Sequence, residues 1–188
     1  MSKPSFFPFP RKRSLRRDEN GSAAIEFALV SLPFFGCLFA IIEIGLLFLA
    51  GQVLDTSVAD ASRMILTGQA QTQNFDADAF KNKICTTGVQ ALFNCNNIKL
   101  DVQTVNDFTA AQNNLTAPVI DSDTNTLDTS QFKFQLGAQC SIVVVRVFYE
   151  WPTYVPGFGL NLANLAGNKH LLISTAAFRN EPYGSNFC

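Results

Sequence analysis

Residues 21–68 read GSAAIEFALVSLPFFGCLFAIIEIGLLFLAGQVLDTSVADASRMILTG, and this stretch decides how the rest of the chain is organised. Between Glu19 and Asp55 the only acidic or basic side chains are Glu26 and Glu43. A helix needs about 20 apolar residues to cross the hydrocarbon core of a bilayer, and this run is longer. The sequence therefore predicts one membrane-spanning helix that continues into water.

The second part of this helix is predicted to be amphipathic. Polar residues return after Gly51, while four apolar residues keep the spacing of one helical face: Leu54, Val58, Ala61 and Ile65. Gly68 supplies a C-terminal stop. We expect the following domain to cover this apolar stripe.

Two residues in the apolar run have no use in a plain anchor. Glu26 places a carboxylate near the start of the run, which costs about 2.5 to 3.5 kcal/mol at the bilayer centre and less near the surface. Pro33 lies seven residues later, nearly on the same face, where it removes a helical hydrogen bond and favours a kink. The structural alternative places Glu26 at headgroup level, where the helix dipole favours it. We interpret Glu26 and Pro33 as part of a helix assembly face.

Charge is distributed unevenly along the chain. Residues 1–20 hold six Lys or Arg against two acidic residues, whereas residues 21–188 hold eight against thirteen. Segments that stay in the cytoplasm are enriched in Lys and Arg. The sequence thus predicts a cytoplasmic leader over 1–21, a transmembrane helix with an amphipathic extension over 22–68, and an exported domain over 69–188.

Two other interpretations of the basic N-terminus fit its context less well. A basic run can bind nucleic acid, but this one directly precedes an apolar helix and contains prolines. A secretory signal peptide has an apolar core of about 7 to 15 residues before a small-residue cleavage site. This run is longer and ends in Phe48-Leu49-Ala50-Gly51. We expect no nucleic-acid partner, and we expect the helix to stay attached to the domain.

The cysteine positions agree with export. Cys37 lies in the apolar run, where it is expected to pack as a small hydrophobe. The other four lie beyond the helix and permit two disulfides in three connectivities: Cys85, Cys95, Cys140 and Cys188. We favour Cys85 with Cys95 and Cys140 with Cys188. Residues ten apart on one unbroken helix are about 15 Å apart, so residues 86–88 must interrupt the helix for the first pair to form.

The exported domain has the pattern of a short helix followed by strands. Asp76 can cap a helix over residues 77–85. Apolar residues then alternate with polar ones in four segments, which predicts strands over residues 98–103, 132–136, 141–151 and 170–178. Residues 106–131 and 152–169 are predicted as loops. The predicted fold class is α+β, with a long N-terminal helix packed on a small antiparallel sheet.

The start of the apolar run resembles a type IV prepilin processing site. A basic leader precedes Gly21, Ser22 would begin the mature chain, and Glu26 and Phe27 would be its fifth and sixth residues. Three later strings follow in a fixed order: Ala59-Asp60-Ala61-Ser62-Arg63, the strand from Val143 to Pro152, and the ending from Ala176 to Tyr183. With the processing-like site in front, the chain resembles the TadE-like family.

This resemblance implies a pseudopilin or minor pilin of the tight-adherence (Tad, or Flp) pilus system. It implies cleavage after Gly21 by a prepilin peptidase, a bacterial inner-membrane location with a periplasmic domain, and a role in initiating or capping the pilus. The implied partners are other minor pilins and the inner-membrane assembly platform. The new amine of Ser22 needs an opposite charge in hydrocarbon, and Glu26 of a neighbouring subunit can supply it.

No motif in the sequence indicates a catalytic site. The single histidine, His170, starts a predicted strand, and the chain lacks G-x-S-x-G, H-E-x-x-H and glycine-rich phosphate motifs. Asp121, Asp123 and Asp128 hint at calcium, but the glycine and final acid of an EF-hand are missing. We expect no enzyme activity, cofactor, metal or small-molecule substrate. A membrane-anchored adhesin or binding module that never polymerises is the alternative function.

Overall fold

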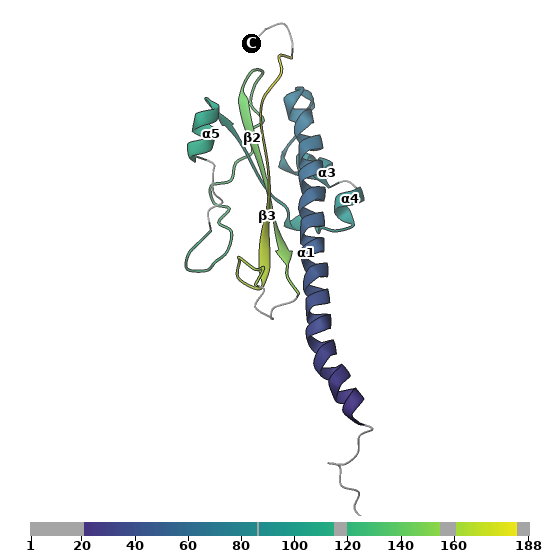
Figure 1. The fold of residues 1–188 in the computed structure, drawn as a ribbon. Coiled ribbons are helices and arrows are strands. Elements are labelled where there is room, and N and C mark those ends of the chain that lie inside the picture. The colour runs from purple at the N-terminus through teal and green to yellow at the C-terminus, as the bar shows by residue number, and fades with distance from the viewer. Residues whose placement is uncertain (1–20, 86, 115–119, 155–160, 184–188) are drawn as a thin grey trace, which may run out of the picture. The chain divides into compact units, whose positions relative to one another are not determined.

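The computed structural model describes residues 21–85, 87–114, 120–154 and 161–183 (Figure 1). The chain divides into two compact units, one ending at Phe39 and the other beginning at Ala40. Helix α1, Ser22–Leu66, runs from the first unit into the second and continues through Pro33. The predicted long helix is therefore present, and it is apolar and long enough to cross a membrane.

The second unit is an α+β domain built on a three-stranded sheet. The strands are β1 (Lys99–Val105), β2 (Ile142–Pro152) and β3 (Lys169–Arg179). They pair antiparallel in the order β1-β2-β3. The predicted fold class, a long helix with a small antiparallel sheet, is confirmed.

The apolar stripe of α1 packs on the helix-facing side of this sheet. Its four residues are each at most 3% exposed: Leu54, Val58, Ala61 and Ile65. They share one core with alternate residues of the central strand: Val143, Val145, Val147, Tyr149 and Trp151. Two periodic patterns, of about 3.6 residues in the helix and 2 in the strand, thus meet in one core, as predicted.

The other side of the sheet is also covered. Phe148 of β2, Leu171 of β3 and Leu165 form a second cluster, with Leu127 and Phe132 packed against it. Segments that precede β2 and β3 therefore lie over this face. Their packing explains why all the residues from Ile142 to Tyr149 are buried.

The predicted fourth strand over residues 132–136 is wrong. This segment makes a single parallel bridge, between Phe134 and Val102 of β1. Its alternating apolar residues do not share one face, because Phe132 joins the second cluster whereas Phe134 and Leu136 pack on the main core. A continuous ladder would require all three to point the same way.

The predicted loop over residues 106–131 contains a helix. Helix α5, Phe108–Asn114, begins after Asp107, whose carboxylate accepts the backbone N–H of Ala110 at 2.6 Å. This side-chain cap stabilises a helix in a stretch whose Asn and Thr content had indicated a loop. Residues 115–119 lie outside the described part of the chain.

Short helices connect α1 to the sheet, and their bounds are α2 (Gln69–Thr72), α3 (Ala77–Ile84), α4 (Thr87–Gln90) and η3 (Cys95–Asn97). The predicted helix after Asp76 is present as α3, and the Asp76 carboxylate accepts the N–H of Ala79 at 2.7 Å. The break between α3 and α4 brings Cys85 and Cys95 together in a disulfide, with their Cα atoms 6.0 Å apart.

Candidate functional site

Gly21 immediately precedes α1 and is exposed. A Cβ atom added to Gly21 would meet no atom within 4 Å, and its φ lies outside the left-handed region that favours glycine. The fold of this chain therefore makes no demand for glycine at position 21. A requirement for glycine here would have to come from another molecule that recognises this segment of the chain.

Glu26 lies on the first turns of α1 and is exposed, as is Phe27. The hydroxyl of Ser22, four residues earlier, donates a hydrogen bond to Glu26 Oε1 at 3.0 Å. Glu26 therefore has one hydrogen-bond partner in its own helix. A single exposed hydroxyl satisfies only part of a carboxylate, which has about four acceptor positions.

Glu43, the other carboxylate of the apolar run, is only 7% exposed. It accepts the backbone N–H of Tyr154, which follows β2 in the same compact unit. The domain thus provides a partner for Glu43, whereas the hydrogen bond of Glu26 is to Ser22 of its own helix. The two carboxylates of the apolar run thus have different environments: Glu26 is exposed and Glu43 is buried.

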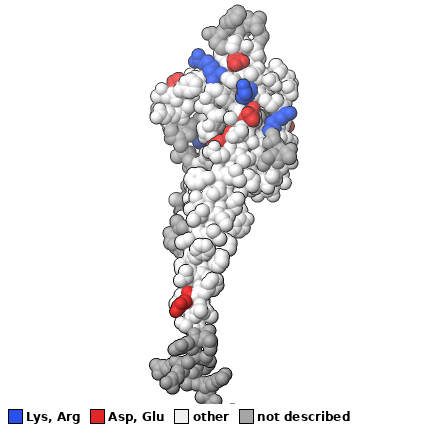
Figure 2. Space-filling view, turned by 45° about the vertical axis from the view of Figure 1, so that its right-hand side comes forward, with Lys and Arg blue, Asp and Glu red and all other residues white. Residues whose placement is uncertain are grey.

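Large apolar side chains are exposed on α1 from Ile25 to Leu49, and past Leu49 the helix exposes none. These two residues are about 36 Å apart along an ideal helix, against about 30 Å for a bilayer core. Figure 2 shows this helix surface free of Lys, Arg, Asp and Glu over most of its length. The single apolar N-terminal helix fits a single-pass membrane anchor.

Residues 21–63 match the family model described as TadE-like protein. The family resemblance seen in the sequence is thus confirmed over this segment, which we call the TadE-like segment. It begins at Gly21 and includes Glu26, Pro33 and most of the stripe that packs on the sheet. No curated protein and no solved structure matches the chain.

Within the TadE-like segment, Pro33 and Gly45 are exposed. A Cβ atom on Gly45 would meet nothing within 4 Å, so small size at this position is not needed by the fold of one chain. Cys37, predicted to pack as a small hydrophobe, is a free and exposed thiol in the single chain. All three residues therefore lie on surface that lipid or a neighbouring helix would cover.

Beyond the TadE-like segment, the structure shows a buried ion pair in the sheet that was not predicted from the sequence. Asp101 of β1 is fully buried, and Arg146 of β2, its cross-strand neighbour, donates to Asp101 Oδ2 from Nε at 3.0 Å. Asp101 Oδ1 also accepts from the side chain of Gln103 and from the backbone N–H of Lys133, each at 2.9 Å. Asp101 therefore links β1 both to Arg146 of β2 and to the segment 132–136 through Lys133. The ion pair has a structural role.

Besides the Cys85–Cys95 disulfide, the domain contains a disulfide at Cys140. Cys140 is disulfide-bonded, and its predicted partner, Cys188, lies outside the described residues. The Cys85–Cys95 bond ties the helix α3 to the turn before β1. Both features belong to the part of the chain expected to be exported, where disulfides persist.

The candidate calcium and catalytic residues have structural roles. Asp121 Oδ1 accepts the backbone N–H groups of Asp123 at 2.8 Å and Thr124 at 3.0 Å, and these bonds lower the pKa of the Asp121 carboxyl. His170 Nδ1 donates to the carbonyl of Leu162. Within the four described ranges, no three His, Cys, Asp or Glu residues lie close enough to hold a metal ion.

Proposed function

We propose that this chain is a minor pilin or pseudopilin of a Tad/Flp-type pilus and that a prepilin peptidase cleaves it after Gly21. The observation that carries the proposal is the position of the TadE-like match, which begins at Gly21. The glycine is exposed and has open space around its Cα, so it is accessible to a peptidase. In this proposal residues 1–21 form the leader, 22–68 the helix and 69–188 the periplasmic domain.

Glu26 is proposed to set the register between neighbouring subunits. Cleavage after Gly21 would give Ser22 a positively charged amine at the start of an apolar helix. Burying that amine among packed helices requires an opposite charge nearby. Of the two carboxylates in the apolar run, Glu26 is exposed, whereas the domain already engages Glu43. The Ser22 hydroxyl competes for Glu26 within one chain, so assembly would exchange this contact for a contact between chains.

The topology follows from charge. The basic leader favours a cytoplasmic N-terminus at the bacterial inner membrane, with the domain in the periplasm. The apolar surface of α1 fits two successive environments, the lipid of the membrane and the neighbouring helices of a pilus. In this proposal the chain initiates or caps the pilus together with other minor pilins on the inner-membrane platform.

The N-terminal sequence and intact mass of the protein from cell envelopes test this proposal. We expect a chain that begins at Ser22 when the prepilin peptidase is co-expressed and at Met1 when it is absent. Gly21→Leu should block cleavage. Gly45→Leu is the matched control, because Gly45 is also exposed and surrounded by open space, and it should leave cleavage unchanged.

A chain that keeps residues 1–21 in the presence of an active peptidase would contradict the proposal. The result would favour the alternative function, a membrane-anchored binding module or adhesin that is never polymerised. That alternative shares the anchor and the domain, so the fold does not separate the two functions. Cleavage after Gly21 and dependence on Glu26 do separate them.

A further inference from the structure

The outer edge of β3 presents backbone groups that no described residue pairs. At the end of the strand, the N–H of Asn180 donates to the carbonyl of Ser141, which precedes β2, at 2.8 Å. At the start, the N–H of Leu171 and the carbonyl of Lys169 bond away from β2, to Asn164 and Leu165. Backbone groups along a paired edge strand point alternately toward and away from its partner. Even-numbered residues of β3 therefore face β2, and odd-numbered residues face outward.

Four outward-facing residues follow the capped start of the strand: Ile173, Thr175, Ala177 and Arg179. All four are exposed, and Ile173 keeps 42% of its surface accessible. Their outward N–H and carbonyl groups have no hydrogen-bond partner in the described structure. Natural sheets usually protect a long edge with proline, a bulge or several charges. From Ile173 to Arg179 the edge has only the charge of Arg179.

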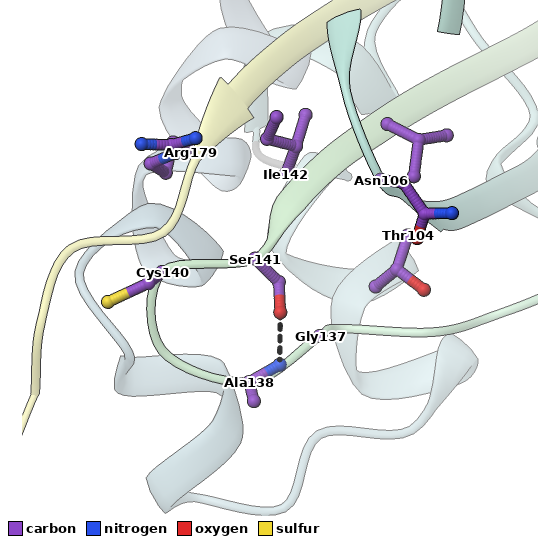
Figure 3. Close-up of a pocket in the computed structure, with 9 residues that line it drawn as sticks. Thr104, Asn106, Gly137, Ala138, Cys140, Ser141, Ile142 and Arg179 are labelled. Carbon is purple, nitrogen blue, oxygen red and sulfur yellow. Dashed lines mark hydrogen bonds between the residues drawn. The ribbon is translucent and has the colours of Figure 1, made fainter. Parts of the chain in front are cut away.

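Arg179 adds a charge preference to this edge. Its side chain is exposed and makes no ion pair with any described residue. A pocket of about 420 Å³ adjoins this end of the strand, and Thr104, Asn106 and Ser141 line it with Arg179 (Figure 3). No acidic side chain is among its described lining residues. The pocket extends toward β1, so the group that a carboxylate at the outer edge of β3 would meet is the guanidinium of Arg179.

We propose that the β3 edge, from Ile173 to Arg179, accepts an extended segment of another envelope protein that carries a carboxylate facing Arg179. The incoming segment adds a fourth strand to the sheet through main-chain hydrogen bonds. Small side chains at Thr175 and Ala177 allow a close approach, and Ile173 offers an apolar contact. The carboxylate fixes the register of the added strand.

A second copy of this chain does not fit the edge in the same way. Two β3 strands paired antiparallel are related by a two-fold axis perpendicular to the sheet. Because α1 packs flat on the sheet through Leu54, Val58 and Ile65, that axis would reverse the direction of one α1 relative to the other. Two helices of opposite direction cannot both anchor copies with the same orientation in one membrane. This excludes β3 of a second copy, and at β1, the other edge strand, Val102 is already bonded to Lys133 and Gln135. We therefore assign the partner segment to a different chain.

The test uses the full-length protein in lipid nanodiscs and two synthetic peptides of alternating Val and Thr. One peptide carries Glu at one end and the other carries Lys at the same position. Residue-resolved amide exchange should show that the Glu peptide protects the amides of Ile173, Thr175 and Ala177. The amides of residues 174, 176 and 178 face β2 and should already be protected without peptide.

Two variants and one control identify the site. Arg179→Glu should weaken binding of the Glu peptide about tenfold and strengthen binding of the Lys peptide. Ala177→Pro removes an outward N–H without removing a bond to β2, and it should weaken both peptides. Arg63→Glu is the matched control, because Arg63 is also an exposed arginine but belongs to α1 and not to β3.

Three results would each overturn the inference: no new protection at millimolar peptide, equal binding of both peptides by the Arg179→Glu variant, or a disulfide-linked dimer of Thr175→Cys in membranes. The dimer would show that a second copy occupies the edge. The inference rests on the membrane anchor but not on cleavage after Gly21. Its failure would therefore leave the proposed function standing, and the reverse also holds.

Discussion

The backbone N–H of Glu181 donates to the carbonyl of Leu66, the last residue of α1, at 2.8 Å. The chain that leaves β3 thus returns to the end of the long helix. There Gly68 has a φ of 77°, and a Cβ on it would lie 2.4 Å from the ring of Tyr183. The side-chain amides of Gln71 and Asn180 both donate to the carbonyl of Leu136 at 3.0 Å. These contacts fix the end of α1 on the domain.

Gly68→Ala should therefore destabilise the domain. The substitution places a Cβ in a left-handed conformation, which costs about 1 to 2 kcal/mol, and forces Tyr183 to move. We expect a lower midpoint in urea unfolding of the full chain in micelles. Gly51→Ala is the control, because Gly51 lies inside α1 with open space around it and should unfold no more easily than the wild type. Equal midpoints for the two variants would contradict this account.

The buried pair of Asp101 and Arg146 gives a second stability prediction. Arg146→Met leaves the Asp101 carboxylate buried without its cation, which typically costs about 3 to 5 kcal/mol. The double change Asp101→Leu with Arg146→Met removes both charges and should recover part of that loss. A double-mutant cycle measured by urea unfolding gives the coupling. Additive effects of the two changes would show that the ion pair makes no coupled contribution.

The Cys85–Cys95 disulfide closes a short loop between α3 and β1. The double change to Ser should lower the free energy of unfolding by about 3 kcal/mol, because the unfolded chain is no longer constrained. Cys37→Ser removes an exposed thiol of α1 and should leave domain unfolding unchanged. A reductant should lower the free energy of unfolding of the wild type. It should not change the free energy of unfolding of a variant in which Cys85, Cys95, Cys140 and Cys188 are all replaced by Ser.

The sequence predicted the structure best where a periodic pattern extended over many residues. Ile65 lies eleven positions after Leu54, and four matches to one helical face predicted the stripe correctly. The short alternation at residues 132–136 was misleading, because tertiary packing sends Phe132 and Phe134 to different clusters. A pattern of three apolar residues cannot show whether a segment is paired along its length or only at one bridge.

Burial of Asp101 could not be predicted from β1 alone. Its alternation with Leu100 and Val102 indicates a polar outer face, and Asp101 does lie on the side away from α1. That side is covered by segments distant in sequence, such as the one containing Lys133, whose N–H bonds to Asp101. Likewise, the contact of Glu43 with Tyr154 joins residues far apart in the chain. Such pairings depend on the topology of the fold.

Asp121 provides a prediction for pH dependence. The backbone N–H groups of Thr124 and Asp123 favour the charged carboxylate and lower its pKa in the folded state. Because the pKa is lower in the folded state, these bonds stabilise the turn at pH values above the unfolded pKa, about 3.9. This stabilisation is lost as the pH falls through the pKa of the folded state. Carboxyl titration by NMR should give a midpoint below that of an unstructured peptide. An equal midpoint would contradict the turn geometry, and Asp121→Asn should abolish the signal.

The different environments of Glu26 and Glu43 predict opposite consequences for two matched variants. Glu26→Val should leave domain unfolding and leader cleavage unchanged but reduce pilus assembly, because an exposed carboxylate contributes to contacts between chains. Glu43→Val should lower the free energy of unfolding by about 1 to 3 kcal/mol, because the backbone N–H of Tyr154 loses its charged acceptor. Urea unfolding and counts of pili per cell, measured on both variants, separate the two roles. Normal piliation with Glu26→Val would argue against a register role for Glu26, and a loss of domain stability in that variant would show that the carboxylate acts within its own chain.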